Sequence, residues 1–251
     1  MRQRGLDPAS TLRLWLFSAA RVRATFPRLL CSLAQILTSP DVVIPFPLVR
    51  SCDGGSFSGE SPAPLVGVCG ANGPPALHFA GSRILNESIR YLTTQHGLTQ
   101  AKEVVVGGCS AGGLAVFLHA DRWAAALPSV PRVVGLVDSG FFLDTSDPES
   151  KSTVGAGSTY ISEMQWVFET MNATDGIGQG HACISYYRSP ASAPHQGETW
   201  RCIFAQHAAA FVKTPIFIMQ SAYDAWQVCH GDGAAPCRPP TPHISEHEPS
   251  P

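Results

Sequence analysis

One short turn in the middle of the chain carries the pattern of a serine nucleophile. Residues 108–112 have the sequence GCSAG, a Gly-x-Ser-x-Gly turn around Ser110. The apolar run 104–106 predicts a buried strand before the turn, and residues 114–118 predict a helix after it that continues towards residue 127. At such a junction the serine takes strained backbone angles that expose its hydroxyl. The pattern therefore favours a nucleophile over the alternative, a capping serine in a tight turn.

The residues on either side of Ser110 have roles of their own. The Ala111 amide lies at the start of the predicted helix, where N–H groups lack intrahelical partners and carry partial positive charge. It would donate to the oxyanion that forms when an ester carbonyl is attacked. We expect Cys109 to be a small buried side chain rather than a second nucleophile.

A serine nucleophile needs a histidine to take its proton and a carboxylate to orient that histidine. In hydrolases with this turn the acid follows the serine in the chain and lies just past a core strand. Asp224 fits, because it follows the predicted strand 213–221. Asp138 and Asp144 remain rivals, and each of the three could instead be a turn or cap carboxylate.

The catalytic base is harder to place. Three histidines follow Asp224, and His230 is too close to the acid for a strand and loop to separate them. His243 and His247 lie in a Pro- and His-rich tail, so none of the three has the expected setting.

A zinc site is an alternative use of the same region. Its four potential ligands are Cys229, Cys237, His243 and His247. The order suits zinc, but the gap between the cysteines is wider than the usual two to four residues. We expect no metal and no cofactor.

Composition limits the class of protein. The 251 residues can form one substantial core, only 14% are charged, and 23 glycines and 21 prolines imply many loops. A net charge of −2 gives no electrostatic case for nucleic acid. Eight cysteines favour an oxidising compartment, and the glycosylation sequons at Asn86 and Asn172 agree with secretion.

The chain divides into three parts. Residues 1–40 hold six arginines and one acid, and their two apolar runs are too short to span a bilayer, so we expect no stable membrane insertion. They match a signal peptide poorly, a transit peptide is a rival, and we expect a basic leader outside the fold. Residues 41–229 form the predicted globular domain, and residues 230–251 are expected to be disordered.

Hydrophobic patterns within 41–229 predict alternating strands and helices. The expected strands are 42–49, 104–106, 133–138 and 213–221, and the expected helices are 81–96, 114–127 and 161–171. This alternation predicts an α/β fold, a mainly parallel sheet with helices on both faces.

Five segments together resemble the pectinacetylesterase family, which includes the Notum carboxylesterases. They are SCDGGSFSG, LHFAGSRI, GGCSAGGLAVFLHAD, VDSGFFLD and KTPIFIMQSAYDAWQ, and they span about residues 51–227 in the family's order. The plant-type branch is the more similar one. The resemblance implies an α/β-hydrolase-like fold and a secreted or cell-wall serine carboxylesterase that removes acetyl groups from pectin, an acetylated polysaccharide.

The resemblance also implies residue roles. Ser110 would be the nucleophile, Asp224 the triad acid, and Ala111 an oxyanion donor. Cys183 and Cys202 resemble a paired-cysteine loop that precedes the family's KTP strand.

Two departures from the family pattern bear on activity. The family's glycine-rich segment ending in Gly-Trp-Cys, which supplies further oxyanion amides, is not found upstream of CDGG. Family members also continue well past AYDAWQ to a histidine beside a cysteine, and the tail of this chain does not resemble that region, since its Cys229-His230 pair follows the motif too closely. We therefore expect a form shortened at both ends, with impaired catalysis. The alternatives are an inactive glycan-binding homologue and a Notum-like protein deacylase.

Overall fold

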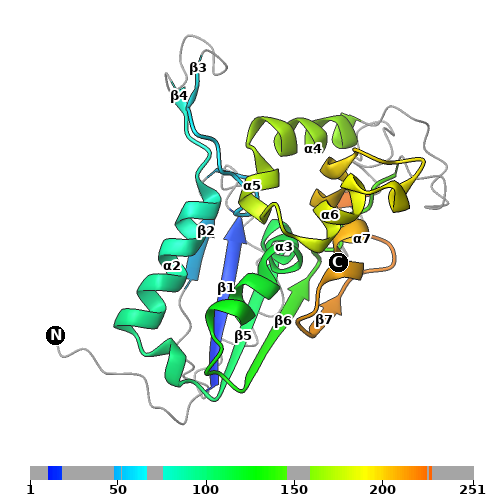
Figure 1. Cartoon of the computed structure of the whole chain (residues 1–251). Coiled ribbons are helices and arrows are strands. Elements are labelled where there is room, and N and C mark those ends of the chain that lie inside the picture. Colours follow the sequence, from blue (N-terminus) through cyan, green and yellow to red (C-terminus); the bar gives the residue numbers. More distant parts are fainter. Residues whose placement is uncertain are drawn as a thin grey trace, which may run out of the picture.

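Five strands form one parallel sheet at the centre of the molecule (Figure 1). The computed structural model describes residues 11–18, 48–51, 53–66, 76–145, 159–224 and 226–227. The strand order is β2-β1-β5-β6-β7, and every neighbouring pair is parallel. The strands are β1 (Thr11–Ser18), β2 (Leu48–Ser51), β5 (Glu103–Cys109), β6 (Arg132–Asp138) and β7 (Ile216–Met219). The predicted α/β-hydrolase-like, mainly parallel sheet is confirmed.

The two middle strands of the predicted pattern are where the sequence placed them. β5 and β6 contain runs of β-branched residues, and Val104, Val106 and Val137 are fully buried. The third predicted core strand, 213–221, is shorter in the structure, with β7 covering Ile216–Met219. Of the predicted strand 42–49, residues 42–47 lie outside the described residues, and β2 begins at Leu48.

The placement of β1 differs from our expectation that residues 1–40 lie outside the fold. Thr11–Ser18 pairs with β2 on one side and β5 on the other, with Leu14 opposite Val106. The segment TLRLWLFS alternates leucine with other residues, which is a strand period of two. The expectation of a leader rested on the basic composition of residues 1–40, which does not report that period. The remaining domain boundaries stay predictions.

Three longer helices match the predicted ones closely. They are α2 (Gly81–Gln95), α3 (Ala111–Ala126) and α4 (Thr159–Thr170). The central helix α3 contacts β1, β5 and β6 and buries apolar residues on nearly all sides, among them Phe117 and Trp123. α3 therefore fixes the position of the turn that precedes it.

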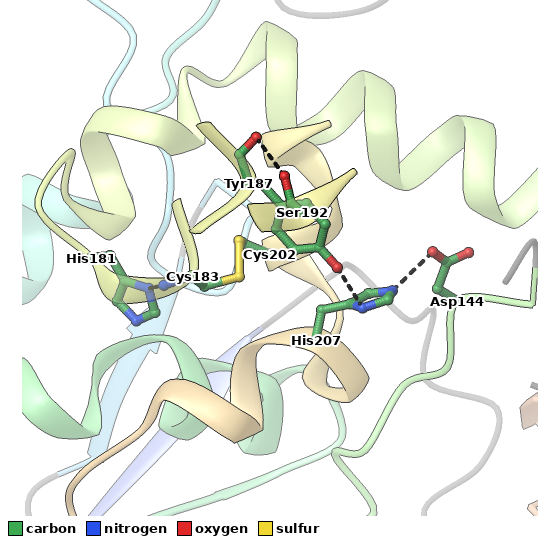
Figure 2. Close-up of a disulfide and its surroundings, with 7 residues drawn as sticks. All are labelled: Asp144, His181, Cys183, Tyr187, Ser192, Cys202 and His207. Carbon is green, nitrogen blue, oxygen red and sulfur yellow. Dashed lines mark hydrogen bonds and ion pairs between the residues drawn. A yellow bond between two sulfur atoms is a disulfide. The ribbon is translucent and has the colours of Figure 1, made fainter. Parts of the chain in front are cut away.

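The segment between α4 and β7 consists of short helices that the sequence did not predict. Its elements are α5 (Ala173–Ile177), α6 (Ala182–Arg188), η3 (Pro190–Ser192), η4 (Thr199–Ile203), α7 (Ala205–Ala208) and η5 (Ala209–Phe211). A disulfide joins Cys183 on α6 to Cys202 on η4, with 5.9 Å between their Cα atoms (Figure 2). Both cysteines are fully buried, so the crosslink holds this irregular segment together from inside.

A small hairpin projects from the sheet (Figure 1). It pairs β3 (Leu65–Val66) with β4 (Ala76–Leu77) in antiparallel fashion. A single turn, η1 (Leu98–Gln100), connects α2 to β5. In the part of the chain that the structure describes, no helix combines the length and apolar character needed to cross a bilayer.

Candidate functional site

The order of the strands marks one place in the sheet for a ligand. From β1 the chain moves outward to β2, whereas from β5 it moves the other way through β6 to β7. The direction therefore reverses between β1 and β5. In open parallel sheets, ligands bind beyond the carboxyl ends of the strands at such a reversal. Ser110 directly follows the last residue of β5 and lies at this point.

Ser110 has the backbone of a strained strand-to-helix turn. Its φ is 53° and its ψ is −123°, angles that a residue with a side chain rarely adopts, and the residue is exposed. Such a conformation costs roughly 1–3 kcal/mol and is retained where the surrounding structure enforces it. The Ser110 hydroxyl has no hydrogen-bond partner among the described residues, so it is available to a substrate.

Glycines let the strand and the helix come close enough to make this turn. A Cβ on Gly108 would lie 2.1 Å from the carbonyl oxygen of Gly112. A Cβ on Gly113 would lie 2.9 Å from the Cα of Gly140, which follows β6. The Ser110 amide also donates to the Asp138 carbonyl at 2.8 Å. These close contacts hold the turn in place against β5, α3 and the loop after β6.

The CDGGSF segment supports the start of α3 from another direction. The Ser56 hydroxyl donates to the Ala111 carbonyl at 2.8 Å, and Ser56 has a positive φ of 51°. His119 on α3 lies 3.1 Å, through Nε2, from the Ser56 carbonyl. Asp53 organises the segment itself, because its carboxylate accepts from the Gly81 amide at 2.6 Å. This aspartate therefore has a structural role at the beginning of α2.

His119 is a buried, neutral imidazole. Burial lowers the pKa of His119 well below 6.5, the nearby Arg122 lowers the pKa further, and the Ser56 carbonyl opposes both effects. Its Nδ1 has no partner among the described residues. His119 therefore stabilises the loop under the turn and is not exposed to a substrate.

Asp224 lies beyond the carboxyl end of β7, at the same edge of the sheet as Ser110. β5 and β7 are separated by two strand spacings, about 10 Å. The Asp224 carboxylate accepts from the amides of Trp226 at 2.9 Å and Gln227 at 3.0 Å, and from Gln220 Nε2 at 2.9 Å. These bonds hold the carboxylate in a fixed turn.

Two glutamines that the sequence interpretation missed tie the loop after β7 to the loop after β6. Gln220 Oε1 accepts from the Phe141 amide at 3.0 Å. Gln227 Oε1 accepts from the Leu143 amide at 2.9 Å, and its Nε2 donates to the Phe141 carbonyl at 3.0 Å. Gln227 belongs to the AYDAWQ segment, so the motif itself was the available signal. The loop after β6 and the loop that carries Asp224 therefore form one unit.

The two rival aspartates have other partners. Asp138, the last residue of β6, accepts from the Ser139 hydroxyl at 3.0 Å. Asp144 is fully buried, forms an ion pair with Arg201 and accepts from His207 Nε2 at 3.0 Å. Tyr187 is hydrogen-bonded to His207 Nδ1 at 2.9 Å, which extends the network towards the disulfide (Figure 2). Asp144 is therefore part of an interior ion network.

The base of a triad is not among the described side chains. No histidine in the described ranges hydrogen-bonds to Ser110 or Asp224. His230, His243 and His247 lie outside the described residues, as do the cysteines of the alternative zinc set. Within the described part of the chain, no cluster of three or more His, Cys, Asp or Glu side chains could hold a metal.

The predicted oxyanion donor, the glycosylation candidates and Cys109 lie at separate places in the structure. Ala111 is the first residue of α3, the position expected for the proposed oxyanion donor. Asn86 is exposed on α2, whereas Asn172 Nδ2 donates to the Glu60 carbonyl at 3.3 Å and to Asp175 at 2.8 Å. Cys109 is disulfide-bonded, which agrees with the expectation that it is not a second nucleophile, and it is half-buried rather than buried.

A parallel sheet with a serine at a strained turn after a central strand is the arrangement of an α/β-hydrolase-like protein. Comparison with known sequences is more specific. The pectinacetylesterase family model matches residues 48–239, and the chain belongs to that family.

Relatives lie in both branches of the family. Pectin acetylesterase 11 of Arabidopsis thaliana is 31% identical over 180 residues, which are 72% of this chain and 39% of that protein. Palmitoleoyl-protein carboxylesterase notum2 of Xenopus laevis is 32% identical over 154 residues, 60% of this chain and 29% of that protein. This chain thus spans well under half the length of these curated relatives.

A solved structure supports the fold. The Wnt deacylase Notum from Drosophila superimposes with a TM-score of 0.64 at 22% identity, over 94% of this chain and 70% of the other.

Proposed function

We propose that this protein is a serine carboxylesterase that removes acetyl groups from pectin outside the cell. The observation that carries the proposal is the exposed, strained Ser110 at the reversal point of the sheet, in a member of the pectinacetylesterase family. We propose an acetylated polysaccharide as the substrate because relatives of this chain are pectin acetylesterases. The buried disulfide supports an oxidising, extracellular setting.

The proposed reaction uses Ser110, Asp224 and the Ala111 amide, together with a histidine from outside the described residues. Ser110 Oγ attacks the acetyl carbonyl carbon while a histidine takes its proton, and Asp224 orients that histidine. The oxyanion accepts a hydrogen bond from the Ala111 amide. The intermediate then collapses, the ester C–O bond breaks, and the sugar oxygen receives the proton from the histidine. Water hydrolyses the acetyl-serine by the same steps and releases acetate.

We expect slow turnover by this chain, because none of the three histidines after Asp224 has the sequence setting that the family pattern gives to the base. Loss of a triad base reduces turnover by roughly six orders of magnitude. Free imidazole can replace a missing imidazole side chain if the other groups are in place. Imidazole rescue is therefore a direct test of the site.

The experiment measures acetate release from acetylated pectin, and p-nitrophenyl acetate hydrolysis, with and without imidazole. Ser110→Ala gives the background rate due to imidazole alone. We expect the wild-type protein to exceed that background, and Asp224→Asn to reduce the excess by up to about 10⁴-fold. Asp175→Asn, on the surface, is the matched control. Equal rates for wild type and Ser110→Ala in every condition would refute the proposal.

The same assays separate the two other functions. Pectin binding without any Ser110-dependent release would identify an inactive glycan-binding homologue. Release of a fatty acid from an acylated peptide, with no acetate from pectin, would identify a protein deacylase.

A further inference from the structure

Two exposed aromatic side chains flank the proposed acid. Tyr223 is 90% exposed and Trp226 is 44% exposed, and they lie on either side of Asp224 in the loop after β7. Exposed aromatic surface therefore lies beside the proposed acid at this edge of the sheet, and exposed apolar surface can mark a binding site.

Trp226 is held firmly by other aromatic rings. Its ring meets Phe142 edge to face at 5.3 Å and Tyr160 at 5.2 Å between centroids. Tyr160 in turn packs against Phe204, which is fully buried. The backbone amide of Trp226 also donates to the Asp224 carboxylate at 2.9 Å. Trp226 is therefore a rigid, half-exposed surface anchored in the core, and a ligand that packs on it pays little entropy for ordering it.

We propose that Trp226, with Tyr223 beside it, is a stacking platform for a sugar ring of the polysaccharide next to the acetylated position. The inference rests on the proposed function, because it places the sugar chain at the site of Ser110 and Asp224. One face of a pyranose ring presents C–H groups, and these pack on the flat face of an aromatic side chain. The ring's hydroxyl groups stay in water at such an open position.

A sugar ring suits this surface better than a fatty acyl chain does. An acyl chain gains affinity from an enclosed apolar cavity that removes it from water. Trp226 packs edge to face with Phe142 and Tyr160 and keeps 44% of its surface exposed. A hollow of about 620 Å³ lies elsewhere, where it is lined by Val133 and Pro215 near the amino ends of β6 and β7.

The test measures binding in the Ser110→Ala background, so that no acetate is released during the titration. Acetylated galacturonic acid oligomers are titrated by isothermal calorimetry into this protein and into the same protein with Trp226→Ala, Trp226→Phe or Tyr223→Ala. Trp166→Ala is the matched control, because Trp166 lies on α4 and is 49% exposed. Circular dichroism confirms that each variant is folded.

We expect Trp226→Ala to raise Kd about tenfold, which corresponds to about 1.4 kcal/mol. Trp226→Phe should retain most of the affinity, Tyr223→Ala should weaken binding less, and Trp166→Ala should not change it. An unchanged Kd for Trp226→Ala, or an equal loss for Trp166→Ala, would overturn the platform. A parallel titration uses decanoate as the acyl probe. If Trp226→Ala abolished decanoate binding and left oligomer binding unchanged, the platform would also be overturned, because that result identifies an acyl site.

The binding result and the test of catalysis by Ser110 can fail separately. A protein without Ser110-dependent acetate release can still bind the oligomer through Trp226. Conversely, an active esterase whose affinity does not depend on Trp226 would refute the platform and leave the proposed function intact.

Discussion

Replacement of Asp144 by asparagine tests whether this aspartate belongs to the interior rather than to the catalytic site. Asp144 is 0% exposed, and Arg201, its ion-pair partner, is 5% exposed. The substitution keeps the side-chain volume, so no cavity forms. It removes the negative charge and leaves the Arg201 guanidinium buried with less compensation.

The expected loss of stability follows from the geometry of the network. Removing one partner of a buried ion pair costs about 3–5 kcal/mol. Here Glu198 still contacts Arg201 Nε at 2.5 Å and is 39% exposed, so part of the compensation survives. We therefore expect a loss of about 3 kcal/mol, at the lower end of that range.

Equilibrium unfolding in urea measures this loss. With an m-value of about 3 kcal/mol per M for a chain of this size, the midpoint should fall by about 1 M. Asp175→Asn, on the surface, should change stability by no more than about 0.5 kcal/mol. The double variant Asp144→Asn with Arg201→Met removes both charges and should be more stable than Asp144→Asn alone.

Two results would refute this reasoning. One is a loss below about 1 kcal/mol for Asp144→Asn, since the pair would then not be desolvated. The other is a double variant whose loss equals the sum of the single losses, since the charges would then not be coupled. Ser110-dependent hydrolysis per folded molecule should stay unchanged in Asp144→Asn and fall in Asp224→Asn, which separates the two aspartates.

Three further predictions concern the turn, the disulfide and pH. Gly108→Ala should destabilise the protein by about 3 kcal/mol in the same urea assay, because its Cβ would lie 2.1 Å from a backbone oxygen, whereas Gly180→Ala, with open space around it, should be neutral. Replacing both Cys183 and Cys202 by alanine should lower the free energy of unfolding by about 3 kcal/mol. A wild-type melting temperature that is the same with and without reductant would contradict this prediction. The folded-state pKa of His119 is lowered, so its contribution to stability is present above pH 6.5 and is lost as the pH falls below that value. His119→Leu should therefore lose about 1 kcal/mol less stability than wild type between pH 7.5 and 5.5, and parallel losses would contradict the assignment.

Local patterns predicted the elements nearest to Ser110 well. β5 contains a run of three valines and α3 a long apolar segment, and the glycine at 108 belongs to the Gly-x-Ser-x-Gly motif, where the strand and the helix come close together. The spacing favoured an acid after a strand, and the family resemblance favoured Asp224 over Asp138, which also ends a strand. The burial of Asp144 depends on Arg201, which is 57 residues away in the chain, and no local pattern contains that information.

Other features depend on packing between distant segments and could not be predicted. The region 173–211 has no sustained period, because its short helices are ordered by a disulfide and an ion network rather than by an amphipathic face. Trp226 and Gln227 lie in a recognised motif, but their roles follow from contacts with residues 141–143 and 160.

The position of β1 in the sheet also indicates which segment of the chain would supply a second amide donor to the oxyanion hole. A second amide donor comes from the loop that follows the strand beside the nucleophile strand. That strand is β1, because Leu16 pairs with Gly108, so the relevant loop begins after Ser18 and not directly before CDGG. That segment lies outside the described residues. Among the described residues, the Ala111 amide at the first position of α3 is the proposed oxyanion donor.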